Sequence, residues 1–111
     1  MPIYQLDDLP EEFVTPRHST AFGRLITGTQ VELGVLRYKA GEGAQEHAHP
    51  HEQILLVLSG KCRLTLDGEA NIIGPGQAAL IPPNLPHALA VIEDAEIISC
   101  KGVVGGVGHR I

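Results

Sequence analysis

The sequence predicts a single all-β domain, a sandwich or barrel built from short strands. Turn-forming residues are abundant, because 13 Gly and 8 Pro occur among the 111 residues. Between these turns lie short stretches of alternating apolar and polar residues, and a turn signal recurs about every ten residues. No stretch shows the sustained 3.6-residue spacing of apolar residues that indicates a helix. A chain of this length has room for one domain.

The strands can be placed between the turns. Residues 1–28 contain three of the prolines and are expected to form an extended arm, followed by a barrel over 29–101 and an irregular Gly-rich tail over 102–111. Asp67-Gly68 is a strong hairpin signal. Strands are expected at 29–38, 45–49, 53–58, 61–66, 69–73, 78–81, 87–92 and 96–100.

The stretch from Gln53 to Leu58 is apolar on both of its alternating faces. A strand of this kind has to be covered on both sides. We expect Leu55, Val57 and, from the next strand, Leu64 to point inward and shape a pocket. The other face is expected to pack against the N-terminal arm or a second subunit.

Composition narrows the function classes. The formal net charge is −5, so the basic surface of a general nucleic-acid or anionic-membrane binder is missing. The N-terminus lacks the basic and apolar regions of a secretory signal, and the longest purely apolar stretch, Ile54 to Leu58, is too short to span a bilayer. Cys62 and Cys100 form no C-x-x-C pair and are interpreted as buried thiols in a reducing compartment. We expect a soluble cytoplasmic protein without nucleic-acid or membrane partners.

A cluster of histidines carries the chemistry. On a strand, residues i and i+2 point to the same face, so His47 and His49 place two imidazoles side by side, about 7 Å apart. The side-chain oxygen of Gln53 could supply a third ligand, and His87, which opens a later strand, can face the same point from across a barrel. Imidazoles in this arrangement suit a divalent transition metal.

The other three histidines, His18, His51 and His109, are expected on the surface or in loops. Of these, His51 could reach the metal or the residues around it if Pro50 kinks the strand. The sequence shows no Ser-His-Asp or Cys-His arrangement and no firm candidate for a general base, so the catalytic residues stay unassigned.

The surroundings of the four candidate ligands resemble the two motifs of the cupin superfamily. The first motif, G-x5-H-x-H-x3,4-E-x6-G, is matched in spacing by Gly41, His47, His49, Gln53 and Gly60. The second motif, G-x5-P-x-G-x2-H-x3-N, is matched by Gly76, Pro82, Asn84, His87 and Val91.

Three positions depart from these motifs, but none of them removes a histidine. Gln53 stands for the usual Glu, Asn84 for the second-motif Gly and Val91 for the final Asn. After glycine, asparagine best tolerates the left-handed backbone conformation, so Asn84 can serve at a glycine position.

The resemblance implies a single-domain cupin barrel, also called a double-stranded β-helix or jelly roll, which forms a homodimer. It implies one divalent transition metal ion (Zn, Fe, Ni or Mn) held by His47, His49, Gln53 and His87. The local string HAHPHEQ is similar to short cupins of pectin degradation that linearise unsaturated uronates, and to zinc-dependent polyketide cyclases. The uronate enzymes carry an acid and an aromatic on the last strand, where this chain has Ser99 and Lys101, so their reaction is not carried over.

With Gln53 in place of a carboxylate, all four ligands are neutral and the bound ion keeps its full charge of +2. Such an ion is a strong Lewis acid and attracts anionic groups. We therefore expect a small-molecule enzyme, an isomerase, cyclase, lyase or dioxygenase, acting on a polar or anionic substrate. The alternatives are a non-catalytic, metal-dependent binder or sensor of a small metabolite, and a structural barrel with an empty site.

Overall fold

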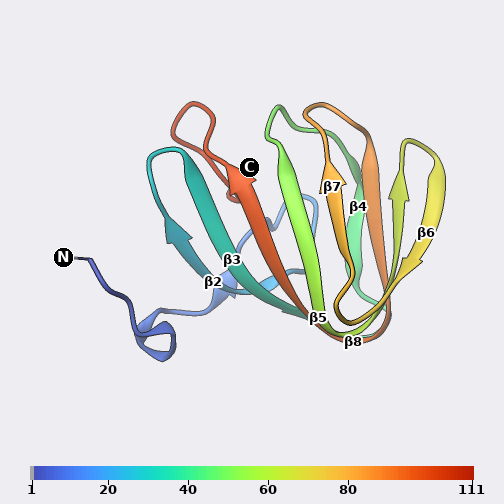
Figure 1. The fold of residues 1–111 in the computed structure, drawn as a ribbon, viewed down its shortest axis with the longest axis horizontal. Coiled ribbons are helices and arrows are strands. Elements are labelled where there is room, and N and C mark those ends of the chain that lie inside the picture. The colour runs from blue at the N-terminus through green and yellow to red at the C-terminus, as the bar shows by residue number, and fades with distance from the viewer. Residues whose placement is uncertain (1) are drawn as a thin grey trace.

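The computed structural model describes residues 2–111, whose regular structure is almost entirely β-strand (Figure 1). A short 3-10 turn, η1 (Leu6–Asp8), precedes the sheet. The strands are β1 (Glu12–Phe13), β2 (Phe22–Thr27), β3 (Val31–Tyr38), β4 (Gly43–His47), β5 (Gln53–Leu66), β6 (Glu69–Ile73), β7 (Ala78–Ile81) and β8 (His87–Gly102). Within residues 2–111, no helix has the length and apolar character needed to cross a bilayer.

The two longest strands, β5 and β8, run antiparallel beside each other along nearly their whole lengths (Figure 1). Gln53 pairs with Lys101 at one end and Leu66 pairs with His87 at the other. Each strand changes its second partner part-way, because β5 pairs first with β7 and then with β6, while β8 pairs first with β4 and then with β3. This exchange of partners along two bent strands folds one sheet into the two facing layers of a jelly roll.

A glycine produces the bend in β5. The β5–β8 register shifts between Val57 and Cys62, and Gly60 lies inside this irregular stretch with φ of +86°. A Cβ atom at Gly60 would overlap the carbonyl oxygen of Asp94 on β8, so the two backbones approach each other as closely as they do only because the side chain is absent.

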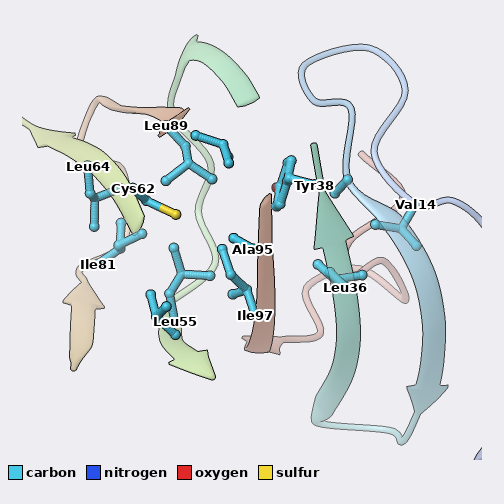
Figure 2. Close-up of a cluster of buried hydrophobic side chains, with 13 residues drawn as sticks. Val14, Leu36, Tyr38, Leu55, Cys62, Leu64, Ile81, Leu89, Ala95 and Ile97 are labelled. Atoms are coloured by element: carbon cyan, nitrogen blue, oxygen red, sulfur yellow. The ribbon is translucent and has the colours of Figure 1, made fainter. Parts of the chain in front are cut away.

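The core fills the space between the layers with aliphatic side chains (Figure 2). Leu55, Val57 and Leu64 of β5 are buried, as the alternation in the sequence predicted. Other strands contribute Leu36, Tyr38, Ile81, Leu89, Val91, Ala95 and Ile97. Cys62 of β5 and, outside the strands, Val14 and Ala21 complete the buried cluster.

The sequence-based strand assignment was largely confirmed, with three differences. The strand expected at 45–49 is β4, Gly43–His47, so it ends two residues earlier. The expected strands 53–58 and 61–66 join into β5, and 87–92 and 96–100 join into β8, because the signals read as breaks are bends within continuous pairing. In addition, Phe22–Thr27, which was assigned to the arm, forms β2 and pairs with β3 over its full length. The Asp67-Gly68 hairpin is confirmed, since both residues have positive φ values, 48° and 82°.

The outward face of β5 is exposed in the single chain. Ile54 is 47% and Leu58 is 46% exposed, and Leu80, which lies next to Ile54 on β7, is 56% exposed. The arm therefore does not cover this part of the strand. The homodimer in which a second subunit covers it remains a prediction.

We predict that Gly60→Ala destabilises the fold by about 3 kcal/mol or more, because the new methyl group meets backbone while φ stays positive. Gly41→Ala is the matched control, since Gly41 has a similar φ of +87° but open space around its Cβ position. The control should lose only the cost of the left-handed conformation, about 1–2 kcal/mol. Urea unfolding of both variants measures the difference, and equal losses would show that the contact with Asp94 does not matter.

Candidate metal centre

Three histidines from separate parts of the chain meet at one end of the barrel. His47 is the last residue of β4, His49 lies in the loop that follows, and His87 opens β8, where it pairs with His47. One ligand nitrogen from each residue can be chosen so that all three lie within 4.8 Å of one another. His49 and His87 are buried and His47 is half-buried. The sequence predicted that these three side chains meet, although His49 lies just beyond the strand rather than within it.

Backbone carbonyls determine which nitrogen of each ring carries the proton. The Nδ1–H groups of His47, His49 and His87 donate to the carbonyl oxygens of Gln45, His51 and Leu85, at 2.6, 3.0 and 2.8 Å. In a neutral imidazole the other nitrogen is then an acceptor. All three Nε2 atoms are therefore left with free lone pairs, as a metal ligand requires.

Burial keeps these imidazoles neutral. It lowers the pKa of His49 to about 4, and the positive charge of Lys101 lowers it further. Burial also lowers the pKa of His47 and that of His87. At neutral pH none of the three rings needs to release a proton before it binds a cation.

Gln53 completes the donor set at the start of β5. Its Oε1 lies 3.1 Å from Nε2 of His49. Both atoms are acceptors in the tautomer described above, so no hydrogen bond joins them and their lone pairs face each other. Both atoms could hold a cation, and its binding would relieve this contact. Three imidazole nitrogens and one amide oxygen that converge without a proton fit a divalent transition metal ion.

Three of the four side chains border a small cavity of about 40 Å³, and His49 does not. His47, Gln53 and His87 line it together with Lys101 of β8. Lys101 is 3% exposed, and no carboxylate within residues 2–111 lies at ion-pair distance from its ammonium group. Burial lowers the pKa of Lys101 to about 8, although Glu32 partly opposes this effect. A larger groove of about 550 Å³ elsewhere on the surface, beside Arg37 and Asp94, includes none of the histidines.

Comparison with known proteins agrees with this geometry. The family model described as "Cupin domain" matches residues 34–100. This chain belongs to the cupin domain family.

Its relatives vary in size. The chain is 35% identical over 85 residues to quercetin 2,3-dioxygenase of Bacillus subtilis. The matched segment covers 75% of this chain but only 25% of that protein. The chain therefore spans about a quarter of the length of this relative.

Two solved structures match this chain along almost all of its length and of their own. The RmlC-like cupin of Shewanella frigidimarina has a TM-score of 0.83 at 15% identity, covering 95% of this chain and 93% of that one. KdgF of Halomonas sp. has a TM-score of 0.79 at 20% identity, covering 92% and 93%.

The loops of this cupin hold the ligands in place through residues of the second motif. Asn84, which stands at the glycine position, has φ of +64°, as its substitution for glycine predicted. Its backbone N–H donates to the carbonyl oxygen of His49 at 2.7 Å. The turn before His87 is thereby tied to the loop that carries His49.

The other predicted pocket residues have separate places. Leu55 and Leu64 line the cavity, whereas Val57 is fully buried outside the lining. His51, expected on the surface or near the metal, is 3% exposed and supports His49 through its backbone carbonyl. Its ring donates from Nε2 to the carbonyl oxygen of Val107 at 2.7 Å.

His109, expected on the surface or in a loop, lies in the irregular C-terminal segment, but it is only 2% exposed and is inserted into the barrel. The sequence analysis gave no role to Lys101, to Glu32 or to His18, whose ring stacks on that of His47 with 4.8 Å between centroids. Lys101 carries a signal that could have been used, because Lys is almost never fully buried without a reason and here lies in an apolar alternating strand.

Both cysteines are free thiols. Cys62 is buried, which raises the pKa of its thiol, whereas Cys100 is only half-buried. The prediction of two buried thiols is therefore confirmed in full for Cys62 alone.

We expect Glu32 to make the stability of this cupin sensitive to acid. Burial by itself raises the pKa of Glu32, but hydrogen bonds from His109 and Thr27 outweigh it and lower the pKa to about 2, from an ordinary value of 4.5. The stabilisation is complete above the ordinary value and is lost as pH falls from about 4.5 to about 2. Denaturant unfolding across this range should show a steep loss in the parent protein and a smaller pH dependence in Glu32→Gln.

Glu12→Gln is the control for this measurement, because Glu12 is an exposed carboxylate paired with Arg110. Exposed ion pairs contribute little to stability. A control as flat as Glu32→Gln, or a Glu32→Gln variant as steep as the parent, would contradict the assignment.

Proposed function

We propose that this cupin is a small-molecule enzyme that acts on an anionic substrate. It binds one divalent transition metal ion through His47, His49, His87 and Gln53. The observation that carries the proposal is the convergence of three deprotonated Nε2 atoms and one amide oxygen beside a buried lysine without a carboxylate partner. An ion bound there acts as a Lewis acid on a substrate oxygen.

The charges around the cavity support an anionic substrate. All four proposed ligands are neutral, so they leave the ion's charge uncompensated. Lys101, which lines the same cavity, adds a further positive charge when it is protonated. No Asp or Glu from residues 2–111 lines the cavity. A carboxylate or enolate that enters the cavity therefore meets two positive groups and no negative one.

The size of the cavity limits what part of the substrate enters. A volume of about 40 Å³ holds roughly three waters. This is enough for a carboxylate group but not for a whole sugar or flavonoid. We propose that an anionic head group enters between His47 and Lys101, while the rest of the molecule stays outside the cavity.

The ligand set and one relative bear on the reaction class. Isomerase, cyclase and lyase chemistry needs polarisation of an oxygen, which the neutral ligand set favours, and the relative named quercetin 2,3-dioxygenase keeps dioxygenation among the classes. One observation favours the alternative of a non-catalytic binder or sensor. No carboxylate lines the cavity among the described residues, so a general base of that kind is missing.

Elemental analysis of the untagged protein should find about one divalent transition metal ion per chain. His47→Ala should reduce the metal content to below about a tenth of an ion per chain, because the substitution removes one ligand. The variant is expected to fold, since His47 is only half-buried. Circular dichroism checks that the variant remains folded. Full metal content in His47→Ala would show that the ligands are assigned wrongly, and a parent protein that takes up no metal on soaking would contradict the proposal.

Lys101→Met should weaken the binding of short mono- and dicarboxylates to the metal-loaded protein by about tenfold or more, because a charge-assisted contact is lost while the side-chain volume stays similar. Calorimetric titration measures the change. Lys61→Met, which removes an exposed lysine, is the matched control and should bind as the parent does. Unchanged carboxylate affinity in Lys101→Met at full metal content would remove Lys101 from the site.

A further inference from the structure

A chain of buried hydrogen bonds connects Gln53 to the C-terminal segment. Nε2 of Gln53 donates to Oγ of Ser99 at 3.0 Å, and Oγ of Ser99 lies 2.8 Å from Nε2 of His109. On the other side of the ring, Nδ1 of His109 lies 2.5 Å from a carboxylate oxygen of Glu32. Ser99, His109 and Glu32 are at most 2% exposed, so water does not compete with these bonds.

The direction of each bond follows from the carboxylate. Glu32 is ionised and accepts only, so the ring of His109 places its proton on Nδ1 and donates it. Burial lowers the pKa of His109, so its Nε2 carries no proton and has to accept. The single hydroxyl proton of Ser99 is therefore directed to His109, and the Ser99 oxygen is left as an acceptor.

This direction settles the orientation of the Gln53 amide. An acceptor at Ser99 attracts the NH₂ end of the amide, so the carbonyl oxygen points the opposite way, toward His49. An amide turned by 180° would place its NH₂ group among the imidazoles, and an NH₂ group cannot ligate a metal. The orientation of Gln53 thus depends on a carboxylate three hydrogen bonds away.

The arrangement of Ser99, His109 and Glu32 has the shape of a nucleophilic triad, but its surroundings exclude that use. Ser99 is 0% exposed, and it is not among the described residues that line the cavity. A nucleophile needs access to substrate. The three residues therefore position another group.

The C-terminal segment is shaped to deliver His109. Gly105 and Gly106 have positive φ values of 59° and 80° and reverse the chain. Gly108 passes so close to Glu32 that a Cβ atom would lie 2.5 Å from its carboxylate. Oγ1 of Thr15 then donates to the carbonyl oxygen of His109 at 2.6 Å. The tail forms no regular strand beyond Gly102, as the sequence predicted, but these glycines permit a defined path into the barrel.

We infer that His109 and Glu32 are positioning residues of the metal centre, which act through Ser99 to hold the oxygen of Gln53 toward the three imidazoles. The inference rests on the proposed function, since it concerns a ligand of the proposed metal. It adds that the C-terminal segment, far outside the histidine motif, sets the affinity of the centre.

The test measures Zn²⁺ affinity by competition with a chromophoric chelator. Ser99→Ala leaves all four ligands in place but frees the amide, so its affinity should fall by about 10–100-fold, as for other residues that orient metal ligands. Tyr38→Phe is the matched control, because it also removes a buried hydroxyl, one that bonds Ser19, but leaves the path from Glu32 to Gln53 intact. Its affinity should stay within about threefold of the parent. Thermal unfolding of the metal-free variants records any loss of stability separately.

The same substitution made in a Gln53→Glu variant separates a loss of amide orientation from a general loss of structure. In Gln53→Glu both ends of the side chain are oxygens, so turning it changes nothing for the metal. Ser99→Ala should therefore cost much less affinity in Gln53→Glu than in the parent, and the difference is the coupling between the two residues. His109→Ala should repeat the pattern of Ser99→Ala.

Each outcome has one meaning. Parent affinity in Ser99→Ala, or an equal loss in the two backgrounds, overturns the inference and leaves the proposed function standing. A comparable loss in Tyr38→Phe also overturns it, because removal of a buried hydroxyl outside the chain of hydrogen bonds would then lower the affinity as much. If the parent itself binds no Zn²⁺, Fe²⁺, Ni²⁺ or Mn²⁺, the proposed function falls first and the inference falls with it.

Discussion

The pairing of β5 with β8 is the constraint on which the rest of the structure depends. It places Gln53 opposite Lys101 at one end and Leu66 opposite His87 at the other. Because alternate residues of a strand share a face, Ser99 and Lys101 both turn inward, beside the residue that opens β5. A shift of one residue would turn these polar groups outward and replace them with apolar ones. The register therefore sets both the core and the polar interior.

Within that frame, protons are assigned by groups that cannot change their role. Backbone carbonyls accept from the three histidines of the centre, and the carboxylate of Glu32 accepts from His109. The second nitrogen of each of these rings is then fixed as an acceptor. All six histidines of the chain take part: four in these bonds, while His18 stacks on His47 and His51 holds both His49 and the last turn of the chain. Such complete use of one residue type explains why histidine is frequent in a chain with so few aromatic residues.

The features that depend on short-range pattern were predictable from the sequence. The all-β class, the Asp67-Gly68 hairpin, the left-handed Asn84 and the meeting of His47, His49 and His87 all follow from local spacing and turn chemistry. The family resemblance supplied the jelly roll, because motif spacing carries information about long-range pairing that alternation alone does not.

Other features needed the three-dimensional structure. The insertion of His109 depends on contacts with Glu32, 77 residues away in the chain, and a tail rich in glycine gives no local sign of a fixed path. The burial of Lys101 also depends on residues distant in the sequence, because its neighbours across the barrel belong to other strands. The continuous strand β5 was divided in the sequence analysis because a bend at glycine and a turn at glycine have the same local signature. The division of β8 fell at residues 93–95, which include two acidic residues and no glycine.

The hydroxyl of Ser99 has one consequence for how the family can vary. A serine hydroxyl can donate as well as accept, so it can bond an amide at position 53 by accepting, or a carboxylate there by donating once the His109 ring is protonated on both nitrogens and donates to the serine oxygen. Exchange of Gln for the Glu of the motif would alter the charge of the centre by one unit while the same strand neighbours remain in place. A barrel of this design can therefore pass between a neutral and an anionic ligand set through a single substitution, with the surrounding backbone unchanged.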